Sequence, residues 1–297
     1  MDTQSFIDLL ELNVPFIKIG SGDANNFPLL RYARSTKVPL VISTGMQNIT
    51  TLNKIYSIMN ENKFTNFALL HCVSSYPTKF EDVDLRFIET YKQLYPDIVI
   101  GYSGHEKGIM PSVAAVILGA KVCSLFINFF NYPGIIVFFF AFKIIERHFT
   151  LDKNQKGSDH FSSLNPVEFK KLIDIIRSVE KDKQNNTSTD NILNILKTLS
   201  QKNNLEISEE LNHIEYSLAN VRNRCIKDCE LPCFRKLGKS CVYSKNLSRG
   251  DIISATDVCI KVSEPSGLSA EYYDSILGKT MKIDCIADSP INKCDFI

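Results

Sequence analysis

Two stretches of the sequence decide its fold: Asp97-Ile-Val-Ile-Gly-Tyr-Ser-Gly-His-Glu106 and Ile145-Glu-Arg-His-Phe-Thr-Leu-Asp152, the second followed by Lys156-Gly-Ser-Asp-His160. In each, an apolar run breaks into polar residues and a histidine. This pattern is typical of a buried parallel strand whose C-terminal end carries chemistry. Two unrelated structural histidines are the alternative, but the matching surroundings favour a shared site. We therefore expect His105 and His148 to lie on neighbouring strand ends, close enough to share a metal ion.

The same unit of strand, polar end and helix recurs along the first half of the chain. Apolar runs that end in polar turns predict earlier strands within 15–23, 39–46 and 67–77, and periodicity predicts helices over 3–13, 27–36, 50–62, 84–94 and 110–120. This alternation indicates a parallel sheet of right-handed βα units. A closed (β/α)8 barrel of the TIM type needs eight units, whereas the sequence shows five and opens on a helix. We therefore expect an α/β fold with an incomplete barrel.

The composition excludes some classes of function. A formal net charge of +1 with 23% charged residues shows no basic footprint of a nucleic-acid-binding protein. The nine cysteines form no CxxC pair and no secretory signal peptide is recognisable, which predicts reduced thiols and a cytoplasmic location. Cys225, Cys229 and Cys233 are spaced as on one helix face, but zinc sites favour tighter pairs, so we expect no metal there.

Four motifs carry a resemblance to a known family: Lys18-Ile-Gly-Ser-Gly-Asp-Ala-Asn-Asn-Phe-Pro28, Ile42-Ser-Thr-Gly-Met-Gln47, Gly101-Tyr-Ser-Gly-His-Glu106, and Glu146-Arg-His148 with Gly157-Ser-Asp-His160. Together they resemble the sialic acid synthases, which make N-acetylneuraminate or its 9-phosphate, over about residues 5–122, 145–180 and 229–297. The resemblance implies condensation of phosphoenolpyruvate with N-acetylmannosamine or its 6-phosphate and release of phosphate. It also implies a divalent metal, Mn²⁺ or Mg²⁺.

The resemblance further implies a role for each polar strand end. One cation and several hydroxyl groups suit a phosphate and a carboxylate, and the phosphoenolpyruvate-binding positions fall on Lys18, Ser21, Ser43 and Ser103. The metal ligands fall on His105 and His148, and the sugar-side positions on Asp23, Tyr76 and Asp159. We expect Glu146 and Asp159 to be the catalytic pair, with Glu146 acting as acid or base or orienting the adjacent ligand. His71 and His160 match no such position and are interpreted as structural.

Two features of the barrel part depart from the family. The family has three strands and an acidic catalytic position ahead of the matching part, and an apolar insertion, Cys123–Ile144, precedes the Glu146 strand. The insertion holds seven of the 19 phenylalanines, which is typical of AT-rich codons and favours a translated intron. The alternative, a membrane segment over Leu125–Phe142, is disfavoured by the Asn, Pro and Gly residues near its centre.

The third departure is the polar stretch Ser178–Asn223, which is longer than the linker of the family. We interpret residues 181–235 as a solvated linker with two short helices, and residues 181–190 within it as flexible. Residues 236–297 alternate short apolar runs with turns and resemble the antifreeze-like SAF domain of the synthases. In that family the SAF domain covers the active site of the partner subunit, which implies a homodimer.

The sequence thus predicts a partial barrel over residues 1–180, a linker over 181–235 and a SAF domain over 236–297. The expected function is the synthase reaction, with activity impaired by the missing strands. The main alternative is an inactive synthase fragment that retains only binding or dimerisation. Another phosphoenolpyruvate-condensing enzyme of the 3-deoxy-sugar-acid type is disfavoured by the SAF segment, and a membrane-attached protein is the remaining alternative.

Overall fold

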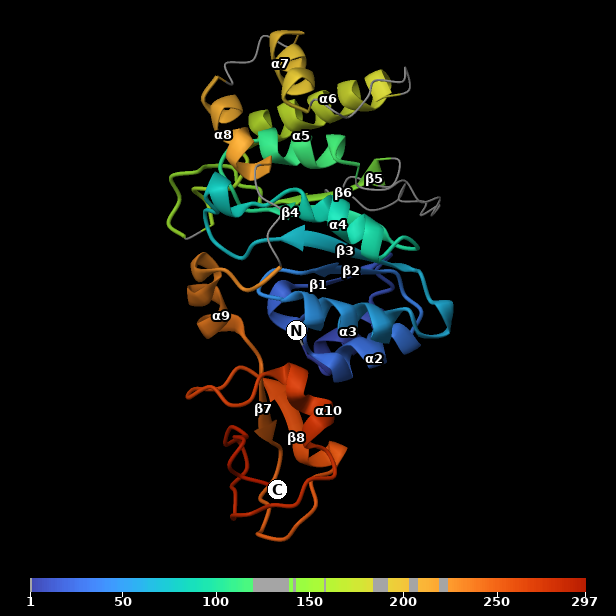
Figure 1. The fold of residues 1–297 in the computed structure, drawn as a ribbon, viewed down its shortest axis with the longest axis vertical. Coiled ribbons are helices and arrows are strands. Elements are labelled where there is room, and N and C mark those ends of the chain that lie inside the picture. Colours follow the sequence, from blue (N-terminus) through green and yellow to red (C-terminus); the bar gives the residue numbers. More distant parts are fainter. Residues whose placement is uncertain are drawn as a thin grey trace.

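The computed structural model describes residues 2–119, 139–140, 143–157, 159–183, 192–202, 208–218 and 224–297. Its centre is a sheet of six strands in the order β1-β2-β3-β4-β6-β5 (Figure 1). The strands are β1 (Ile17–Ile19), β2 (Leu40–Ser43), β3 (Phe67–Cys72), β4 (Val99–Gly104), β5 (Phe139–Phe140) and β6 (Lys143–Arg147). All neighbours are parallel except β5, which runs antiparallel to β6. The parallel half-barrel expected from the sequence is therefore confirmed.

Helices lie between and outside these strands and bury their apolar faces against the sheet. They are α1 (Thr3–Glu11), α2 (Phe27–Ser35), α3 (Ile49–Met59), α4 (Phe87–Leu94) and α5 (Met110–Ile117), with short 3-10 turns η1 (Ser21–Asp23), η2 (Glu61–Lys63) and η3 (Phe80–Asp82). Asn13, Asp84 and Gly119 adopt positive φ angles of 50°, 48° and 82°. Because this backbone conformation cannot continue a right-handed helix, α1 and α5 end earlier than the sequence pattern predicts and α4 begins later.

The segment interpreted as a solvated linker contributes to the core instead. Helices α6 (Pro166–Lys183), α7 (Ile192–Lys202) and α8 (Ser208–Leu218) pack together over α5, as Figure 1 shows. Leu196, Leu199 and Ile214 are buried in the same apolar cluster as the barrel strands. Burying such side chains stabilises the fold by about 1.5–3 kcal/mol each, so these helices belong to the barrel domain. The stretch 181–190, expected to be flexible, lies largely outside the described residues.

The C-terminal residues form a second unit with its own apolar cluster. Its elements are η5 (Asp228–Glu230), α9 (Leu231–Leu237), β7 (Ser240–Tyr243), η6 (Ala255–Asp257), β8 (Val258–Lys261), η7 (Ala270–Tyr272) and α10 (Tyr273–Ile276), where η5 and α9 lead into the unit. Strands β7 and β8 pair antiparallel. The unit contacts α2 and α3 through the hydrogen bond from Thr51 to Glu271 and the ion pair of Arg31 with Asp274, 2.6 and 2.5 Å long.

The insertion predicted at Cys123–Ile144 lies mostly outside the described residues. Within it the structure places only β5 and the first residues of β6. The interpretations as a translated intron or a membrane segment therefore concern residues that are not described. In the described part of the chain, no helix has both the length and the apolar character that crossing a membrane requires.

His71 on β3 illustrates the structural histidines. Its ring is fully buried against Phe87, Tyr91 and Tyr102, and its Nε2–H donates to the Val83 carbonyl over 2.7 Å. Burial, reinforced by the nearby Arg224 cation, lowers the pKa of His71 to about 3. The structural role expected from the sequence is confirmed.

This pKa makes the folded protein sensitive to acid. Between the unfolded pKa near 6.5 and the folded value, only the unfolded state takes up the proton, so stability falls as the pH falls. From pH 7 to 5 we expect His71 to account for a loss of about 2 kcal/mol in the free energy of unfolding. Urea unfolding of wild type and His71→Gln, which keeps a donor for Val83, measures this contribution. An equally steep pH dependence in the variant would contradict it.

Candidate active site

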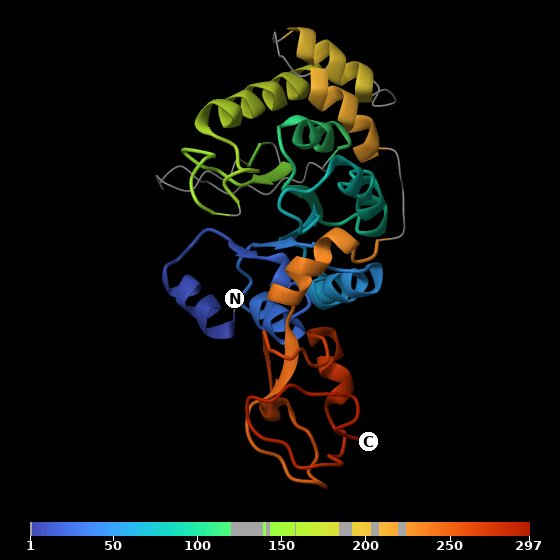
Figure 2. The same ribbon diagram turned by 90° about the vertical axis from the view of Figure 1, so that its left-hand side faces the viewer.

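The C-terminal ends of the parallel strands surround one cavity of about 370 Å³. The strands point to the side on which α9 lies, and Figure 2 views the molecule from that side. The lining residues are Lys18, Gly20, Ser21, Gly22, Asp23, Ser43, Met46, Cys72, Ser74, Tyr76, Ser103, His105, Glu146, His148, Leu237 and Lys239. Nine of the ten predicted site residues are therefore together, and Asp159 lies outside the lining.

A larger cavity of about 510 Å³ is lined by residues between 75 and 87 and by the segment 224–229, which precedes α9. Its main charged pair is Lys227 with Asp84, whose atoms are 2.7 Å apart. Because these charges neutralise each other and no strand end supplies a row of donors, the smaller cavity is the stronger candidate for chemistry.

The central ion pair of the site joins the first and last parallel strands. Lys18 Nζ lies 2.9 and 2.8 Å from the two carboxylate oxygens of Glu146, and Ser43 Oγ donates to the same carboxylate over 3.4 Å. Burial raises the pKa of Glu146, but the Lys18 ammonium and neighbouring hydroxyl donors outweigh it and leave this pKa below its usual value. Glu146 is thus an anion at neutral pH, able to accept a proton or hold a cation.

Hydroxyl groups line the cavity next to Lys18. Ser21 Oγ accepts from the Gly45 N–H over 3.1 Å. A Cβ atom at Gly45 would lie only 2.2 Å from Ser74 Oγ and 2.8 Å from Ser21 Oγ, so glycine is required for this close approach. Ser74 Oγ is buried and has no hydrogen-bond partner among the described atoms, which leaves its donor available to a ligand.

His105 and His148 lie side by side at the ends of β4 and β6, with ring centroids 5.2 Å apart. The predicted adjacency is confirmed. His105 Nδ1–H donates to the Val73 carbonyl over 2.8 Å, which leaves Nε2 as the free nitrogen lone pair. Burial, together with the adjacent His105, lowers the pKa of His148 and favours its neutral form. The ring of Tyr76 packs against that of His105, with the two ring centroids 4.3 Å apart.

This donor set fits a divalent metal that accepts mixed ligands. Burial lowers the pKa of His105, but the neighbouring Cys72 and the Val73 carbonyl outweigh it and leave this pKa above its usual value, so a metal bound there would displace a proton. Once deprotonated, two imidazoles are better suited to Mn²⁺ than to Mg²⁺, and oxygen atoms of ligands and water can fill the other positions. Within the described residues, no cluster of three or more His, Cys, Asp or Glu side chains could hold a metal by itself. A metal bound between His105 and His148 would therefore need further ligands, such as oxygen atoms of the substrate or of water.

The two remaining predicted residues are carboxylates, Asp23 in the cavity lining and Asp159 outside it. Asp23 is buried and pairs with Lys239 over 3.4 Å, and Asp159 Oδ2 lies 3.7 Å from His148 Nδ1. A carboxylate beside a ligand histidine orients the ring, so the geometry favours such a role for Asp159. His160 Nδ1 lies 2.8 Å from Thr150 Oγ1, as suits a structural histidine.

Arg147 lies between Glu146 and His148 in the sequence but does not line the cavity. Side chains alternate along a strand, so Arg147 points away from the cavity, where its guanidinium lies 2.7 Å from Glu106. Both side chains are almost completely buried, and Glu106 also accepts from Tyr102 over 2.7 Å. This buried network fixes the end of β4, which carries His105.

Two family models match the sequence: the NeuB family over residues 1–126 and 136–188, and the SAF domain over 238–297. The chain belongs to the NeuB family. It is 44% identical over 294 residues to the N-acetylneuraminate-9-phosphate synthase of Drosophila melanogaster, covering 98% of this chain and 69% of that protein. With the human N-acetylneuraminate-9-phosphate synthase the identity is 37%, over 98% of this chain and 65% of the relative. The chain thus spans about two thirds of these relatives.

Solved structures agree with the NeuB assignment. The Bacillus subtilis spore coat polysaccharide biosynthesis protein SpsE superposes with a TM-score of 0.72 at 25% identity, covering 100% of this chain and 72% of that one. The sialic acid synthetase of Leptospira borgpetersenii gives a TM-score of 0.51 at 31% identity, over 61% of this chain and 55% of the other. The expected family and the barrel followed by a SAF domain are confirmed.

Sequence reasoning missed several residues of this cavity. Met46, Cys72, Ser74, Leu237 and Lys239 line the cavity, and none of them stood out in the strand-end pattern. Lys239 was a usable signal, because the stretch Lys236-Leu-Gly-Lys239 joins the end of α9 to the start of the SAF domain. Cys225, Cys229 and Cys233 do not share one helix, since only Cys233 lies in α9.

Proposed function

We propose that this chain carries the active site of a sialic acid synthase. In the reaction, phosphoenolpyruvate condenses with N-acetylmannosamine or its 6-phosphate, water is consumed, and N-acetylneuraminate or its 9-phosphate forms with release of inorganic phosphate. The observation that carries the proposal is that Lys18, four serine hydroxyls, Glu146 and two histidines line one cavity. The curated relatives named as N-acetylneuraminate-9-phosphate synthases support the phosphorylated sugar as substrate.

The phosphoenolpyruvate side of the cavity is the part near Lys18. Its ammonium group and the hydroxyls of Ser21, Ser43 and Ser103 supply a cation and several donors for the phosphate and carboxylate groups. Glu146, held as an anion by Lys18, is placed to accept a proton during the reaction.

The sugar side of the cavity is the part near the histidines and Tyr76. A divalent cation such as Mn²⁺, held by His105 and His148, would supply Lewis-acid polarisation of the sugar aldehyde. Burial raises the pKa of Tyr76, which keeps its hydroxyl protonated and able to donate to a sugar oxygen. Asp23 adds an acceptor for sugar hydroxyls, and Asp159 orients His148.

We also propose a homodimer, in which the SAF domain of one subunit covers the site of the other. A cytoplasmic location is a further part of the proposal. The SAF-domain match supports the dimer. Sedimentation of the purified chain tests it.

The function is tested by incubating the chain with phosphoenolpyruvate, Mn²⁺ and N-acetylmannosamine, free or 6-phosphorylated. We expect sialic acid, or its 9-phosphate, and inorganic phosphate in equal amounts. Binding of phosphoenolpyruvate without product would support the alternative of an inactive synthase that retains its ligand site. A folded chain that neither binds phosphoenolpyruvate nor forms product would refute the proposal.

A further inference from the structure

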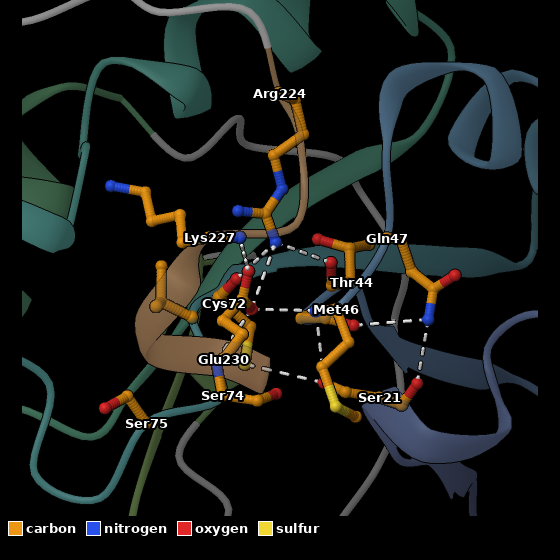
Figure 3. Close-up of polar contacts among 12 residues, drawn as sticks. Ser21, Thr44, Met46, Gln47, Cys72, Ser74, Ser75, Arg224, Lys227 and Glu230 are labelled. Carbon is orange, nitrogen blue, oxygen red and sulfur yellow. Dashed lines mark hydrogen bonds and ion pairs between the residues drawn. The ribbon is translucent and has the colours of Figure 1, made fainter. Parts of the chain in front are cut away.

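The segment between α8 and the SAF domain contributes two buried charged side chains that contact the loops after β2 and β3. Arg224 and Glu230 have fully buried side chains, and their charged atoms lie 3.6 Å apart (Figure 3). Neither residue lines the active-site cavity. Burying an ion pair costs desolvation free energy, so their further contacts decide what the pair does.

Each of the two side chains bridges the same two loops, those that follow β2 and β3. Glu230 Oε1 accepts from the backbone N–H groups of Met46 and Ser74 over 2.7 and 2.9 Å. Arg224 Nη2 donates to the carbonyl oxygens of Thr44 and Cys72, both over 2.9 Å. We call this pair the Arg224–Glu230 clamp; Figure 3 shows it between the loops.

The hydrogen bonds of the clamp follow directly on the last backbone hydrogen bonds between β2 and β3. Strands β2 and β3 pair up to Ser43 opposite Leu70, and the Thr44 N–H still donates to the Leu70 carbonyl over 3.0 Å. Beyond this point the clamp provides the partners for the Thr44 and Cys72 carbonyl groups and, two residues further along each loop, for the Met46 and Ser74 N–H groups. The Arg224 carbonyl also accepts from the Ile49 N–H at the start of α3, over 3.1 Å.

These two loops carry much of the active site. Of the sixteen residues that line the cavity, Ser43, Met46, Cys72, Ser74 and Tyr76 belong to the loops or to the strand residues that begin them. The first loop also holds Ser21, because Gly45 N–H donates to Ser21 Oγ and Gln47 Nε2 donates to the Ser21 carbonyl, over 3.1 and 3.0 Å. A shift of either loop would therefore displace the hydroxyls around Lys18.

We propose that Arg224 and Glu230 are positioning residues, which fix the two loops and thereby the hydroxyl groups that bind the phosphate and carboxylate of the substrate. This inference rests on the proposed function for the identity of the ligand. Its geometric part, the fixing of the loops, does not depend on it. The clamp acts through directed hydrogen bonds to the backbone, so its two charges are not interchangeable.

The test combines two measurements on the full chain: amide hydrogen exchange at Met46 and Ser74, and the Kd for phosphoenolpyruvate. For Glu230→Ala we expect exchange at both amides to accelerate and the Kd to rise by about 10-fold, as is typical when a group that orients ligand-binding residues is removed. Glu230→Gln keeps an acceptor oxygen and should stay close to wild type, which guards against a variant that fails to fold.

A charge swap separates positioning from simple ion pairing. In Arg224→Glu/Glu230→Arg the ion pair is retained, but carboxylate would face carbonyl oxygens and guanidinium would face N–H groups. We expect the swap to leave exchange fast and phosphoenolpyruvate binding weak. Restoration of both by the swap would overturn the proposal, because it would reduce the clamp to an ion pair.

Lys227→Met is the matched control, because Lys227 lies in the same segment but its side chain pairs with Asp84, over 2.7 Å, and makes none of the clamp's hydrogen bonds to Thr44, Met46, Cys72 and Ser74. We expect it to leave both measurements unchanged; effects as large as those of Glu230→Ala would overturn the proposal. Wild-type exchange in a folded Glu230→Ala variant would also overturn it. If the wild-type chain does not bind phosphoenolpyruvate, the proposed function fails, and the exchange data alone decide whether the clamp fixes the loops.

Discussion

Replacing Lys18 by alanine should weaken phosphoenolpyruvate binding by about 100-fold while leaving sugar binding nearly unchanged. Lys18 is the cation at the centre of the hydroxyl cluster, and hydrogen bonds to charged groups contribute about 1.5–3 kcal/mol, against about 2.7 kcal/mol for a 100-fold change. Removing it also takes away the charge that lowers the pKa of Glu146. The effect of burial, which raises the pKa of Glu146, is then opposed less strongly, so we expect this pKa to rise. Isothermal titration with each substrate measures both affinities.

Lys107→Ala is the control for this prediction. Lys107 also follows the end of β4, but its ammonium lies over the Phe161 ring at 3.7 Å and it does not line the cavity. We expect this variant to bind phosphoenolpyruvate like the wild type. An equal loss of sugar and phosphoenolpyruvate affinity in Lys18→Ala would show instead that Lys18 maintains the fold through its ion pair with Glu146.

Removal of both cavity histidines should raise the Kd for Mn²⁺ by at least about 100-fold, since they are the proposed nitrogen ligands and no other described cluster can replace them. His105→Ala and His148→Ala should each account for a large part of this loss. The free Mn²⁺ signal in electron paramagnetic resonance measures the affinity without any need for turnover. Binding should also weaken as the pH falls, because protons compete for the imidazoles.

His160→Ala is the matched control for the metal prediction, because His160 lies in the loop after β6 and contacts Thr150 rather than the cavity. We expect its Mn²⁺ affinity to equal that of the wild type. Undiminished binding in the His105→Ala/His148→Ala variant would place the metal elsewhere.

The polar residues at the strand ends could be predicted, because they depend on the local sequence pattern and on one rule of parallel sheets. Consecutive strands bring their C-terminal ends to one edge, so Lys18, Ser43, Ser103 and Glu146 could be grouped before their distances were known. The alternation of side chains along β6 likewise accounts for Glu146 and His148 facing the cavity on either side of Arg147.

The Arg224–Glu230 clamp could not be predicted in the same way. Its partners lie 152 to 184 residues away in sequence, and they are backbone groups, which carry no residue identity that a pattern could reveal. Helices α7 and α8 were misjudged for a related reason. Their many polar residues suggested a solvated spacer, whereas only a narrow stripe including Leu196 and Ile214 is needed to dock them on α5.

The central claim is that phosphoenolpyruvate and a divalent metal share the cavity at the strand ends. The ³¹P line width of phosphoenolpyruvate, measured with the Mn²⁺-loaded chain, tests it most directly. We expect broadening beyond that caused by the same concentration of free Mn²⁺, and its loss both in Lys18→Ala, which should still bind the metal, and in His105→Ala/His148→Ala. Broadening that persists in both variants, or none at phosphoenolpyruvate concentrations that saturate the chain, would contradict a shared site.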